Sequence, residues 1–318
     1  MKELAYEVGF ELVGITSPEA ESAYARYASQ MEAGYGAQMT WLYERPEVRR
    51  DVRSIHPSTS SVIVFGVSYA SQTPGYLESP PGPDEGWIAR YAQGRDYHHD
   101  VKKMGIRLAK LLSAEPGFEF ESSAHRVFVD TGPVLEKAFA HRAGLGWMGK
   151  NTLLINRDLG SWVFLGVILT PLELAFDAPG TDHCGSCTRC LDACPTDAFP
   201  EPYVLDAQAC IATWTIESPE PADVIRPESL GQHVFGCDIC QEVCPWNRGV
   251  PDGRLPALAP REENVRPALV TLTGLDDSAF KARFPRSAVR RTSAEKMSTV
   301  VEIIRSRVRA ESDTHSEG

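Results

Sequence analysis

The stretch that decides the fold is Cys184-Gly-Ser-Cys187-Thr-Arg-Cys190-Leu-Asp-Ala-Cys194-Pro195. Its spacing, C-x2-C-x2-C-x3-C-P, is that of bacterial ferredoxins, in which three cysteines bind one [4Fe-4S] cluster and the fourth binds a second cluster. A cubane cluster presents its irons at the corners of a tetrahedron, so a tight loop reaches three of them. The fourth ligand must come from elsewhere in the chain. The run therefore predicts two clusters, each completed by distant cysteines.

The other four cysteines complete both sets. The run Cys237-Asp-Ile-Cys240-Gln-Glu-Val-Cys244-Pro245 has the same ending, and Cys210 stands alone between the two runs. The ferredoxin rule then gives two sets, one of Cys184, Cys187, Cys190 and Cys244, and one of Cys194, Cys210, Cys237 and Cys240. Because C-x2-C is also a zinc signature, a pair of zinc sites is the alternative. Two runs that each end in C-x3-C-P favour clusters.

Length and hydrophobicity are those of a globular protein. The 318 residues are 42% hydrophobic, enough for one large domain or two. Met1 to Phe10 holds no apolar run of signal-peptide length, and no later stretch approaches membrane-spanning length. We therefore expect a cytoplasmic protein with no membrane partner. In that reducing compartment, eight cysteines indicate metal ligation and not disulfides.

Charge is distributed unevenly along the chain. The net charge of -11 argues against non-specific coating of nucleic acid. Between Lys281 and Ala310, however, nine basic residues stand against two acidic ones, a local charge of +7. The basic residues are Lys281, Arg283, Arg286, Arg290, Arg291, Lys296, Arg305, Arg307 and Arg309. The C-terminal segment is thus a candidate surface for a polyanion, with a solvated helix face as the alternative.

The hydrophobic pattern predicts three parts. Residues 1–175 alternate between strand and helix patterns and predict an α/β layer domain. Residues 176–250 hold the cysteines, and residues 251–318 read as a linker followed by short helices. Within the first part we expect strands over 62–68, 125–130, 152–155 and 162–169, and helices over 101–112 and from Pro133 through Phe139, closed by Gly144. The proline-rich loop 69–86 is either a lid or a surface excursion.

Two local motifs invite functional interpretations. Gly144 to Lys150 matches both G-x-G-x-x-G and the start of a phosphate-binding loop, but it lies after a helix and before a strand, the reverse of what nucleotide binding needs. We expect these glycines to permit a tight turn or close approach to a flat ligand. His98 and His99 are neighbours, so at most one of them faces any site. On pattern alone, solvent exposure is favoured for both.

Asp130 is the candidate catalytic acid. It follows a predicted buried strand and precedes Thr-Gly-Pro and a helix, a position where mixed sheets often place ligands. One interpretation is a helix cap. The other is a proton donor whose pKa is raised by a dry pocket.

Several segments together resemble the epoxyqueuosine reductase family. They are Tyr91-Ala-Gln-Gly-Arg-Asp-Tyr-His98, Val129-Asp-Thr-Gly-Pro-Val-Leu-Glu136, the stretch from Ala143 to Ile155, Gly160-Ser-Trp-Val-Phe-Leu-Gly166, the first cysteine run, Thr215-Ile-Glu217, and the stretch from Phe235 to Asn247. The resemblance implies a nitroreductase-like domain that binds cobalamin, beside a ferredoxin-like domain with two [4Fe-4S] clusters and a short helical C-terminal segment.

The same resemblance implies a reaction and its partners. The clusters would feed cob(II)alamin to give cob(I)alamin, and reductive loss of the epoxide oxygen would convert epoxyqueuosine at the tRNA wobble position to queuosine. The basic segment would contact the anticodon stem-loop. A flavodoxin or ferredoxin would donate electrons, and we expect a monomer. The alternatives are a reductive dehalogenase, a plain electron-transfer protein, and a tRNA-binding protein with structural clusters.

The resemblance also assigns site residues. The proton donor falls on Asp130, in agreement with its independent interpretation. Corrin contacts are implied for Arg53, Gln93, Tyr97, His98, Asp130, Leu154, Leu165, Cys237, Asp238, Ile239 and Cys240. The chain departs from the family at Thr131-Gly132, where Ser-Ala is common, and at Lys137, where arginine is common. Lysine keeps the charge but loses the forked donor geometry of arginine. No D-x-H-x-x-G cobalamin motif is present, because Val101 occupies its glycine position.

Overall fold

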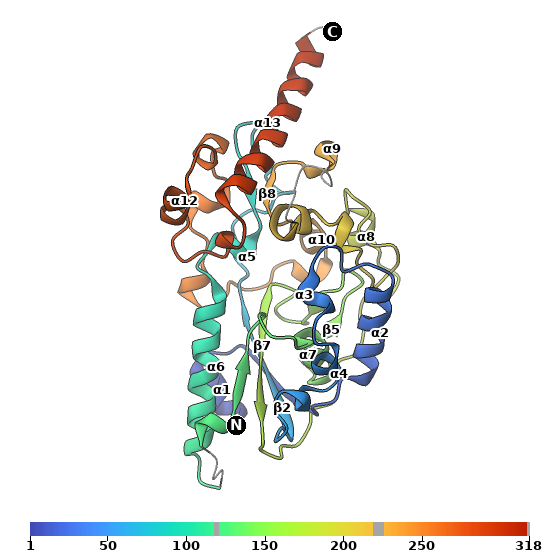
Figure 1. The fold of residues 1–318 in the computed structure, drawn as a ribbon, viewed down its shortest axis with the longest axis vertical. Coiled ribbons are helices and arrows are strands. Elements are labelled where there is room, and N and C mark those ends of the chain that lie inside the picture. Colours follow the sequence, from blue (N-terminus) through green and yellow to red (C-terminus); the bar gives the residue numbers. More distant parts are fainter. Residues whose placement is uncertain (118–120, 219–225, 317–318) are drawn as a thin grey trace.

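A four-stranded antiparallel sheet lies at the centre of the first part of the chain (Figure 1). The computed structural model describes residues 1–117, 121–218 and 226–316. The strands lie in the order β1 (Leu12–Thr16), β2 (Ser61–Ser68), β7 (Val163–Thr170) and β4 (Arg126–Phe128), and every neighbouring pair is antiparallel. The domain is therefore the α+β form of the mixed fold that we expected.

The helices surround this sheet and continue beyond it. In chain order they are α1 (Lys2–Val8), α2 (Glu21–Glu32), α3 (Thr40–Tyr43), α4 (Pro46–Arg50), α5 (Arg90–Gln93), α6 (Tyr97–Ala114), α7 (Glu136–Arg142), α8 (Arg189–Asp192), α9 (Pro227–Leu230), α10 (Ile239–Glu242), α11 (Glu262–Val265), α12 (Asp277–Arg283) and α13 (Ala294–Ser316). Short strands form two further pairs, β3 (Trp87–Ile88) with β8 (His233–Phe235) and β5 (Trp147–Met148) with β6 (Leu154–Ile155).

Both faces of the sheet are covered, which explains the continuous apolar run of β2. Ile63 and Phe65 pack in one cluster with α1 and α6, whereas Val62 and Val64 pack with α7 on the opposite face. This alternation follows from the two-residue period of a strand. Helix α6 lies very close to the sheet, because a Cβ on its Gly105 would meet a methyl group of Val127 at 2.7 Å.

Some predicted boundaries are wrong. Strand β4 ends at Phe128, two residues before Asp130, and α7 begins at Glu136 and not at Pro133. The intervening residues turn too sharply for a helix, since Asp130 has a φ of 58° and Thr131 N donates to Val129 O at 2.6 Å. Gly144 does close α7, with a φ of 74°. The C-terminal segment ends in one 23-residue helix, α13, and not only in short ones.

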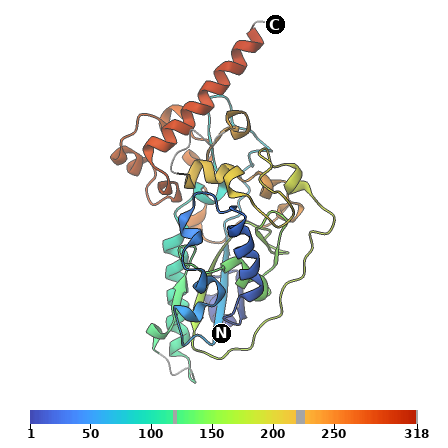
Figure 2. The ribbon, with the colours of Figure 1, turned by 45° about the vertical axis from the view of Figure 1, so that its right-hand side comes forward.

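The cysteine region stands at one end of the sheet, on the side away from the N-terminus. Figure 2 shows an extended segment that leaves β7 and runs along the outside of the molecule before it reaches α8. The elements that follow are short turns of helix, including a π-helical turn over Thr213–Glu217. A region that is organised by metal ligands, and not by a broad apolar core, is expected to form short elements of this kind.

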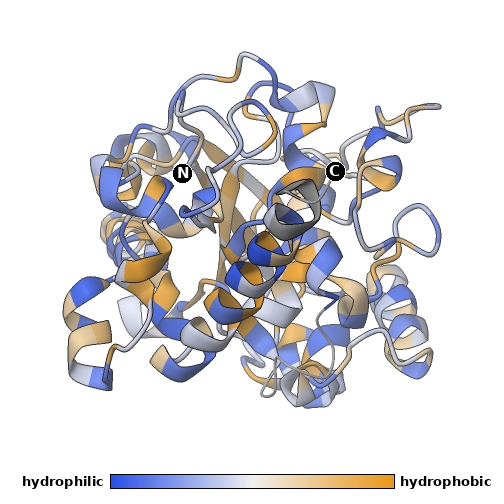
Figure 3. Cartoon of the chain, turned by 90° about the horizontal axis from the view of Figure 1, so that it is seen from above, coloured by the Kyte–Doolittle hydropathy of each residue, from blue (hydrophilic) through white to orange (hydrophobic). Residues whose placement is uncertain are grey.

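The C-terminal segment shares a hydrophobic core with earlier parts of the chain. Val300 and Ile304 of α13 pack in one cluster with Ile88, Trp214 and Phe235. In the view from above, hydrophobic positions gather along the strands and the inner sides of helices (Figure 3). The end of α13 projects from the body in both side views (Figures 1 and 2). The division at residues 175 and 250 remains a prediction, since this core crosses it. In the described part of the chain, no helix is both long and apolar enough to cross a bilayer.

Candidate active site and cluster-binding loops

A cavity of about 930 Å³ opens beside the carboxyl end of β4. Its wall combines residues of α2 and α3, the turn from Asp130 to Leu135, helix α7, strand β7 and, from the C-terminal segment, Arg291. That volume lies near the upper end of the range for small-molecule and cofactor sites in proteins. Chain segments from both ends of the sequence therefore build one site.

Asp130 and His98 form a hydrogen-bonded pair at this wall. His98 Nε2 lies 3.0 Å from Asp130 Oδ2, and His98 Nδ1 lies 2.6 Å from Asp96 Oδ1. Asp96 caps α6 by accepting a bond from the His98 backbone N–H at 3.0 Å. The imidazole therefore bridges two carboxylates, and the helix cap fixes its position. His99 is exposed, so one member of the histidine pair reaches the site and the expectation of exposure is wrong for His98.

Aromatic stacking holds this pair from behind. The Tyr97 ring stacks on Phe164 at 3.8 Å between centroids with 8° between planes, and on His98 at 4.1 Å. Tyr97 also shares a side-chain hydrogen bond with Asp130. Phe164 lies on β7 and stacks on Tyr97, which in turn stacks on His98. The central sheet therefore fixes the position of the His98 ring relative to the cavity. The Asp130 side chain lines the cavity wall and is 59% exposed.

Electrostatics place the proton on His98 and not on Asp130. Burial alone would raise the pKa of Asp130, but hydrogen bonds with His98 and Tyr97 outweigh it and hold that pKa below its usual value. Burial also opposes charge on His98, yet Asp130 and Asp96 raise its pKa to about 9. At neutral pH the pair is imidazolium and carboxylate. The expected rise in the Asp130 pKa is therefore wrong, because α6 brings the His98 cation within hydrogen-bond distance of Asp130.

The helix-cap interpretation of Asp130 is also wrong. The N-cap of α7 is Leu135, which makes no side-chain cap bond, and Asp130 lies five residues earlier with the left-handed φ of 58°. Left-handed backbone is costly for a residue with a side chain and is concentrated at functional sites. Asp130 is thus held in a strained turn that directs its carboxylate to His98.

Helix α7 adds two titratable side chains that sequence reasoning did not place in the site. Burial raises the pKa of Glu136 to about 8, and its buried Oε1 has no hydrogen-bond partner. Lys137 Nζ donates to Thr152 O at 2.8 Å, and burial lowers its pKa although Glu136 and Asp130 oppose that shift. The Lys137 amine therefore lies near the carboxyl groups of both Glu136 and Asp130. The only sequence signal for Glu136 was its position at the start of the helix after the catalytic turn.

The structure brings the first set of predicted cluster ligands together. Burial, followed by the thiols of Cys244, Cys184 and Cys187, raises the pKa of Cys190 to about 11. Cys244 in turn lies near Cys184 and Cys187. The second cysteine run therefore contributes one thiol to the neighbourhood of the first run, as the ferredoxin rule requires.

The second set forms an adjacent group. Burial and the thiols of Cys240 and Cys210 raise the pKa of Cys237, and the nearest thiol to affect Cys210 is that of Cys194. The Cys190 thiol of the first set also raises the pKa of Cys240, so the two groups of cysteines are adjacent. Among the described residues, no three His, Cys, Asp or Glu side chains converge on a single metal ion. A cubane spreads its four ligands over four irons, so the looser grouping fits a cluster.

The glycine-rich segment connects the cavity domain to both cysteine runs. It forms the β5–β6 hairpin and opens no helix, so its resemblance to nucleotide-binding loops has no structural basis. Lys150 Nζ donates to Gly185 O at 2.7 Å and to Cys187 O at 3.0 Å, and Asn151 Nδ2 donates to Cys240 O at 3.3 Å. Sequence reasoning missed both positioning residues, although they lie inside a segment that carries the family resemblance.

The predicted corrin contacts divide into two groups. Tyr97, Asp130 and Leu165 line the cavity, and His98 reaches it through Asp130. Arg53 does not line it, since its Nη2 pairs with Asp51 at 2.6 Å and with Glu19 at 2.8 Å.

The remaining predicted contacts do not line the cavity. Gln93 is buried and donates to Ile88 O at 2.8 Å, which leaves its Oε1 unpartnered. Leu154 is buried on β6. Cys237, Asp238, Ile239 and Cys240 form the turn into α10. In that turn, burial raises the pKa of Asp238 to about 6 while its Oδ2 accepts from Arg90 N at 2.6 Å.

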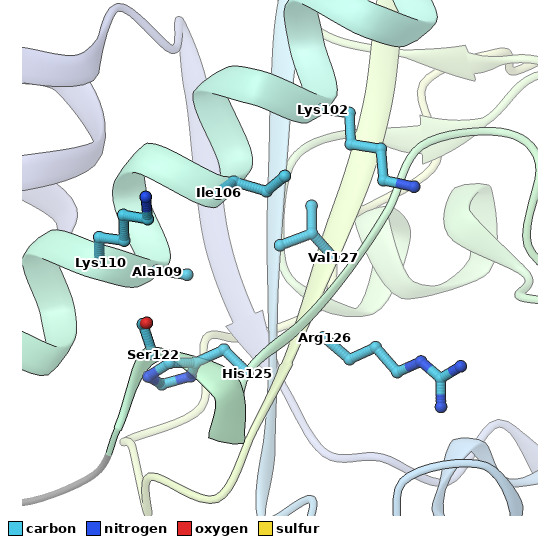
Figure 4. A pocket seen from close by; sticks show the side chains of 8 residues that line it. All are labelled: Lys102, Ile106, Ala109, Lys110, Ser122, His125, Arg126 and Val127. Atoms are coloured by element: carbon cyan, nitrogen blue, oxygen red, sulfur yellow. The ribbon is translucent and has the colours of Figure 1, made fainter.

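The long loop 69–86 does not line the cavity, so the interpretation as a lid is wrong. Backbone N–H groups of Tyr76 and Leu77 donate to the Glu242 carboxylate at 2.7 and 2.8 Å, which fastens the loop to the cluster region. A second hollow of about 250 Å³ lies between α6 and β4 (Figure 4). Its eight described lining residues, Lys102 and Arg126 among them, include none of the predicted site residues.

Basic residues of the C-terminal segment serve two purposes. Five of them bond within the protein: Arg283 to Asn264 at 2.8 Å, Arg290 to Lys281 O at 2.6 Å, Arg291 to Glu217 at 2.8 Å, Lys296 to Ser218 O, and Arg307 to Glu311 at 2.7 Å. Arg291 also lies on the cavity wall. The exposed ones are Lys281, Arg286, Arg290, Arg291 and Arg309. The surface free to meet a polyanion is therefore smaller than the summed charge implies.

Fold and site together define a redox enzyme of the double-cluster iron–sulfur class. Residues 183–247 match the family described as 4Fe-4S double cluster binding domain, which decides between clusters and zinc. Residues 49–131 match the family described as epoxyqueuosine reductase QueG. An epoxyqueuosine reductase of Synechocystis sp. is 43% identical over 87% of this chain and 93% of its own length. The chain belongs to the epoxyqueuosine reductase family and is an oxidoreductase.

Solved structures of this family share the fold. A crystal structure of epoxyqueuosine reductase with an epoxyqueuosine-modified tRNA-Tyr stem loop is 28% identical, with a TM-score of 0.85 over 95% of this chain and 80% of that one. The Bacillus subtilis epoxyqueuosine reductase, solved with its catalytic aspartate loop swung out of the active site, is 26% identical with a TM-score of 0.83. It covers 95% of this chain and 80% of that one. Family membership sets aside the dehalogenase and plain electron-transfer alternatives.

Proposed function

We propose that this protein reduces epoxyqueuosine in tRNA to queuosine at the 930 Å³ cavity, with Asp130 as the proton donor. The reaction takes two electrons and two protons, and the epoxide oxygen leaves as water while an alkene remains. The observation that carries the proposal is the Asp130–His98 hydrogen bond at the wall of a cofactor-sized cavity. A catalytic aspartate loop in the Bacillus subtilis relative supports the same role for Asp130.

The cysteines fit two [4Fe-4S] clusters. Cys184, Cys187, Cys190 and Cys244 would hold one cluster, and Cys194, Cys210, Cys237 and Cys240 the other. Their grouping in the structure and the lack of any disulfide among the eight free thiols support this ligand set. Bound clusters supply electrons one at a time. Lys150 and Asn151 hold the two cysteine loops against the cavity domain.

Cobalamin, which the family resemblance implies, fits the cavity. The volume is large, and the unpartnered carboxyl oxygen of Glu136 offers a buried polar contact of the kind that amide-bearing ligands use. Tyr97, Asp130 and Leu165 would contact it directly. Bound there, cobalamin supplies a reducing, nucleophilic cobalt. Phe164 and Leu165 would add apolar surface to the cavity wall around it.

Proton delivery follows from the electrostatics of the pair. Because Asp130 is ionised and His98 is protonated at neutral pH, the available proton lies on His98 Nε2, 3.0 Å from Asp130 Oδ2. Negative charge that develops on the epoxide oxygen beside Asp130 draws this proton through the carboxyl group. Asp96, at 2.6 Å from His98 Nδ1, holds the ring in place for the transfer. Asp130 thus acts as a relay as well as an acid.

The partners follow from the same proposal. A tRNA anticodon stem-loop, bound by the solved relative with a TM-score of 0.85, would meet the exposed basic residues of the C-terminal segment. We further propose that the protein works in the cytoplasm as a monomer and takes its electrons from a flavodoxin or ferredoxin.

Nucleoside analysis of tRNA tests the function in cells. Deletion of the gene should cause epoxyqueuosine to accumulate in place of queuosine, and a plasmid copy should reverse this change. A copy that carries Asp130→Asn should fail to reverse it. Normal queuosine levels in the deletion strain would remove the proposed function.

A further inference from the structure

Trp41 and Arg291 come from opposite ends of the chain and meet at the cavity. Trp41 lies on α3, and Arg291 closes the 3-10 turn Ala288–Arg291. The guanidinium carbon of Arg291 is 6.0 Å from the centre of the Trp41 ring, and both residues line the cavity. Trp41 is 45% exposed and the Arg291 side chain 49% exposed. What distinguishes Trp41 is its place, because its exposed ring stands beside a guanidinium at the wall of a cavity, where it offers a flat face to a ligand.

The backbone that carries Trp41 and the side chain of Arg291 are both anchored. Arg49 is buried and donates to Trp41 O at 2.9 Å, and Tyr27 donates to Leu42 O, so the backbone of α3 is fixed at two points. Arg291 forms a forked pair with Glu217, with both N···O distances at 2.8 Å. A guanidinium that is held on one edge by a carboxylate presents a planar face for stacking. Trp41 and Arg291 together form a stacking platform that is in place before any ligand binds, which lowers the entropic cost of binding.

Charge at the cavity favours an anionic ligand. Six lysines and arginines line it, against three acids, in a protein whose net charge is -11. The basic residues are Arg26, Arg45, Arg49, Lys137, Arg142 and Arg291. The combination of an exposed aromatic ring, an arginine plane and surrounding cations is the one by which proteins bind unpaired nucleotides.

We propose that Trp41 and Arg291 bind one unpaired base of the substrate RNA loop, next to the nucleotide that enters the cavity, by stacking on its face. This inference rests on the proposed function and deepens it. Because every base has a π face, the contact tolerates different bases and positions the loop without reading its sequence. The nucleotide to be reduced is thereby drawn out of the stacked loop toward Asp130.

Equilibrium filter binding with a labelled epoxyqueuosine anticodon stem-loop tests this platform in the cluster- and corrinoid-loaded protein. Trp41→Ala should weaken stem-loop binding about tenfold or more, whereas Trp41→Phe should stay near the wild-type affinity because it keeps a stacking ring. Phe176→Ala serves as the matched control, since Phe176 is similarly exposed, at 54%, but does not line the cavity. Corrinoid content is measured by absorbance in each variant.

Three results of this binding experiment would each count against the stacking platform. Equal stem-loop affinity for Trp41→Ala and wild type would overturn the platform but leave the proposed function intact. Loss of corrinoid with unchanged RNA affinity would overturn it as well and assign Trp41 to the cofactor. If the wild-type protein does not bind the stem-loop at all, the proposed function fails, and the platform fails with it.

Discussion

His98 Nε2 lies 3.0 Å from Asp130 Oδ2, although 32 residues separate the two along the chain. The contact joins the first turn of α6 to the turn after β4, and it exists because both elements pack on the central sheet. It sets the ionisation of both groups, since the pKa of Asp130 is lowered and that of His98 is raised to about 9. The proposed catalytic acid is thus a pair and not a single carboxyl group.

Turnover should depend on the protonation of His98. As the pH rises through about 9, wild-type kcat should fall because the imidazolium loses the proton that it relays. His98→Gln should be slower at pH 7 by about tenfold or more, and its remaining rate should not show this decline. A pH–rate profile from pH 6 to 10 measures both effects.

Two controls make that profile specific. His99→Gln changes the exposed neighbour and should behave like wild type. Glu136 has a pKa of about 8, so Glu136→Gln separates its titration from that of His98. An unchanged decline near pH 9 in His98→Gln would show that another group carries the proton.

The His98–Asp130 ion pair should also make the thermal stability of the protein depend on pH. The pKa of His98 is 6.5 in the unfolded chain and about 9 in the folded protein, so its ion pair contributes full stability below about pH 6.5 and loses it as the pH rises through about 9. The difference in Tm between wild type and His98→Gln should therefore shrink between pH 7 and pH 10. Thermal unfolding monitored by circular dichroism measures it. A difference that grows with pH would contradict the assignment.

The crossed ligand sets can be separated by iron analysis and EPR spectroscopy. Cys184→Ser and Cys244→Ser should each lose the same cluster, and Cys210→Ser should lose the other, so that iron falls from about eight to about four per chain. Cys184 and Cys244 come from different cysteine runs, so shared loss of one EPR signal is a direct test of the crossing. If Cys244→Ser instead removes the signal that Cys210→Ser removes, each run holds its own cluster.

Exposed basic residues of the C-terminal segment should control the salt dependence of RNA binding. Arg286→Gln combined with Arg309→Gln should reduce the slope of log K against log salt by about 0.7 to 0.9 for each RNA phosphate that the variant no longer neutralises. The control is Lys102→Gln with Lys110→Gln, two exposed lysines of α6 beside the smaller hollow. A slope that changes equally in both double variants would mean that only net charge matters.

Features that depend on local spacing were predictable from the sequence. The double-cluster domain was predictable from the cysteine runs, because three thiolates must lie within one tight loop. The strand Ser61–Ser68 was expected because a strand buried on both faces is apolar throughout. Asp130 was found because a lone acid after a strand, in a turn before a helix, is unusual there.

Features that depend on the meeting of distant segments were not predictable. Nothing in the pattern around His98 indicates that α6 begins opposite the end of β4, so the pKa of Asp130 was expected to move in the wrong direction. The same holds for Trp41 and Arg291, which lie 250 residues apart in the sequence and meet only in the folded chain. Glu136 was missed because burial at the first turn of a helix depends on what packs against it.

Conversion of the substrate by the reconstituted protein tests the central claim most directly. Protein loaded anaerobically with iron, sulfide and cobalamin, and supplied with a chemical reductant, should convert an epoxyqueuosine stem-loop to queuosine with the loss of one oxygen atom by mass spectrometry. Asp130→Asn should lower kcat by about 10²- to 10⁴-fold while its iron and corrinoid contents stay at wild-type levels. Full turnover by Asp130→Asn, or no turnover by the loaded wild-type protein, would contradict the account.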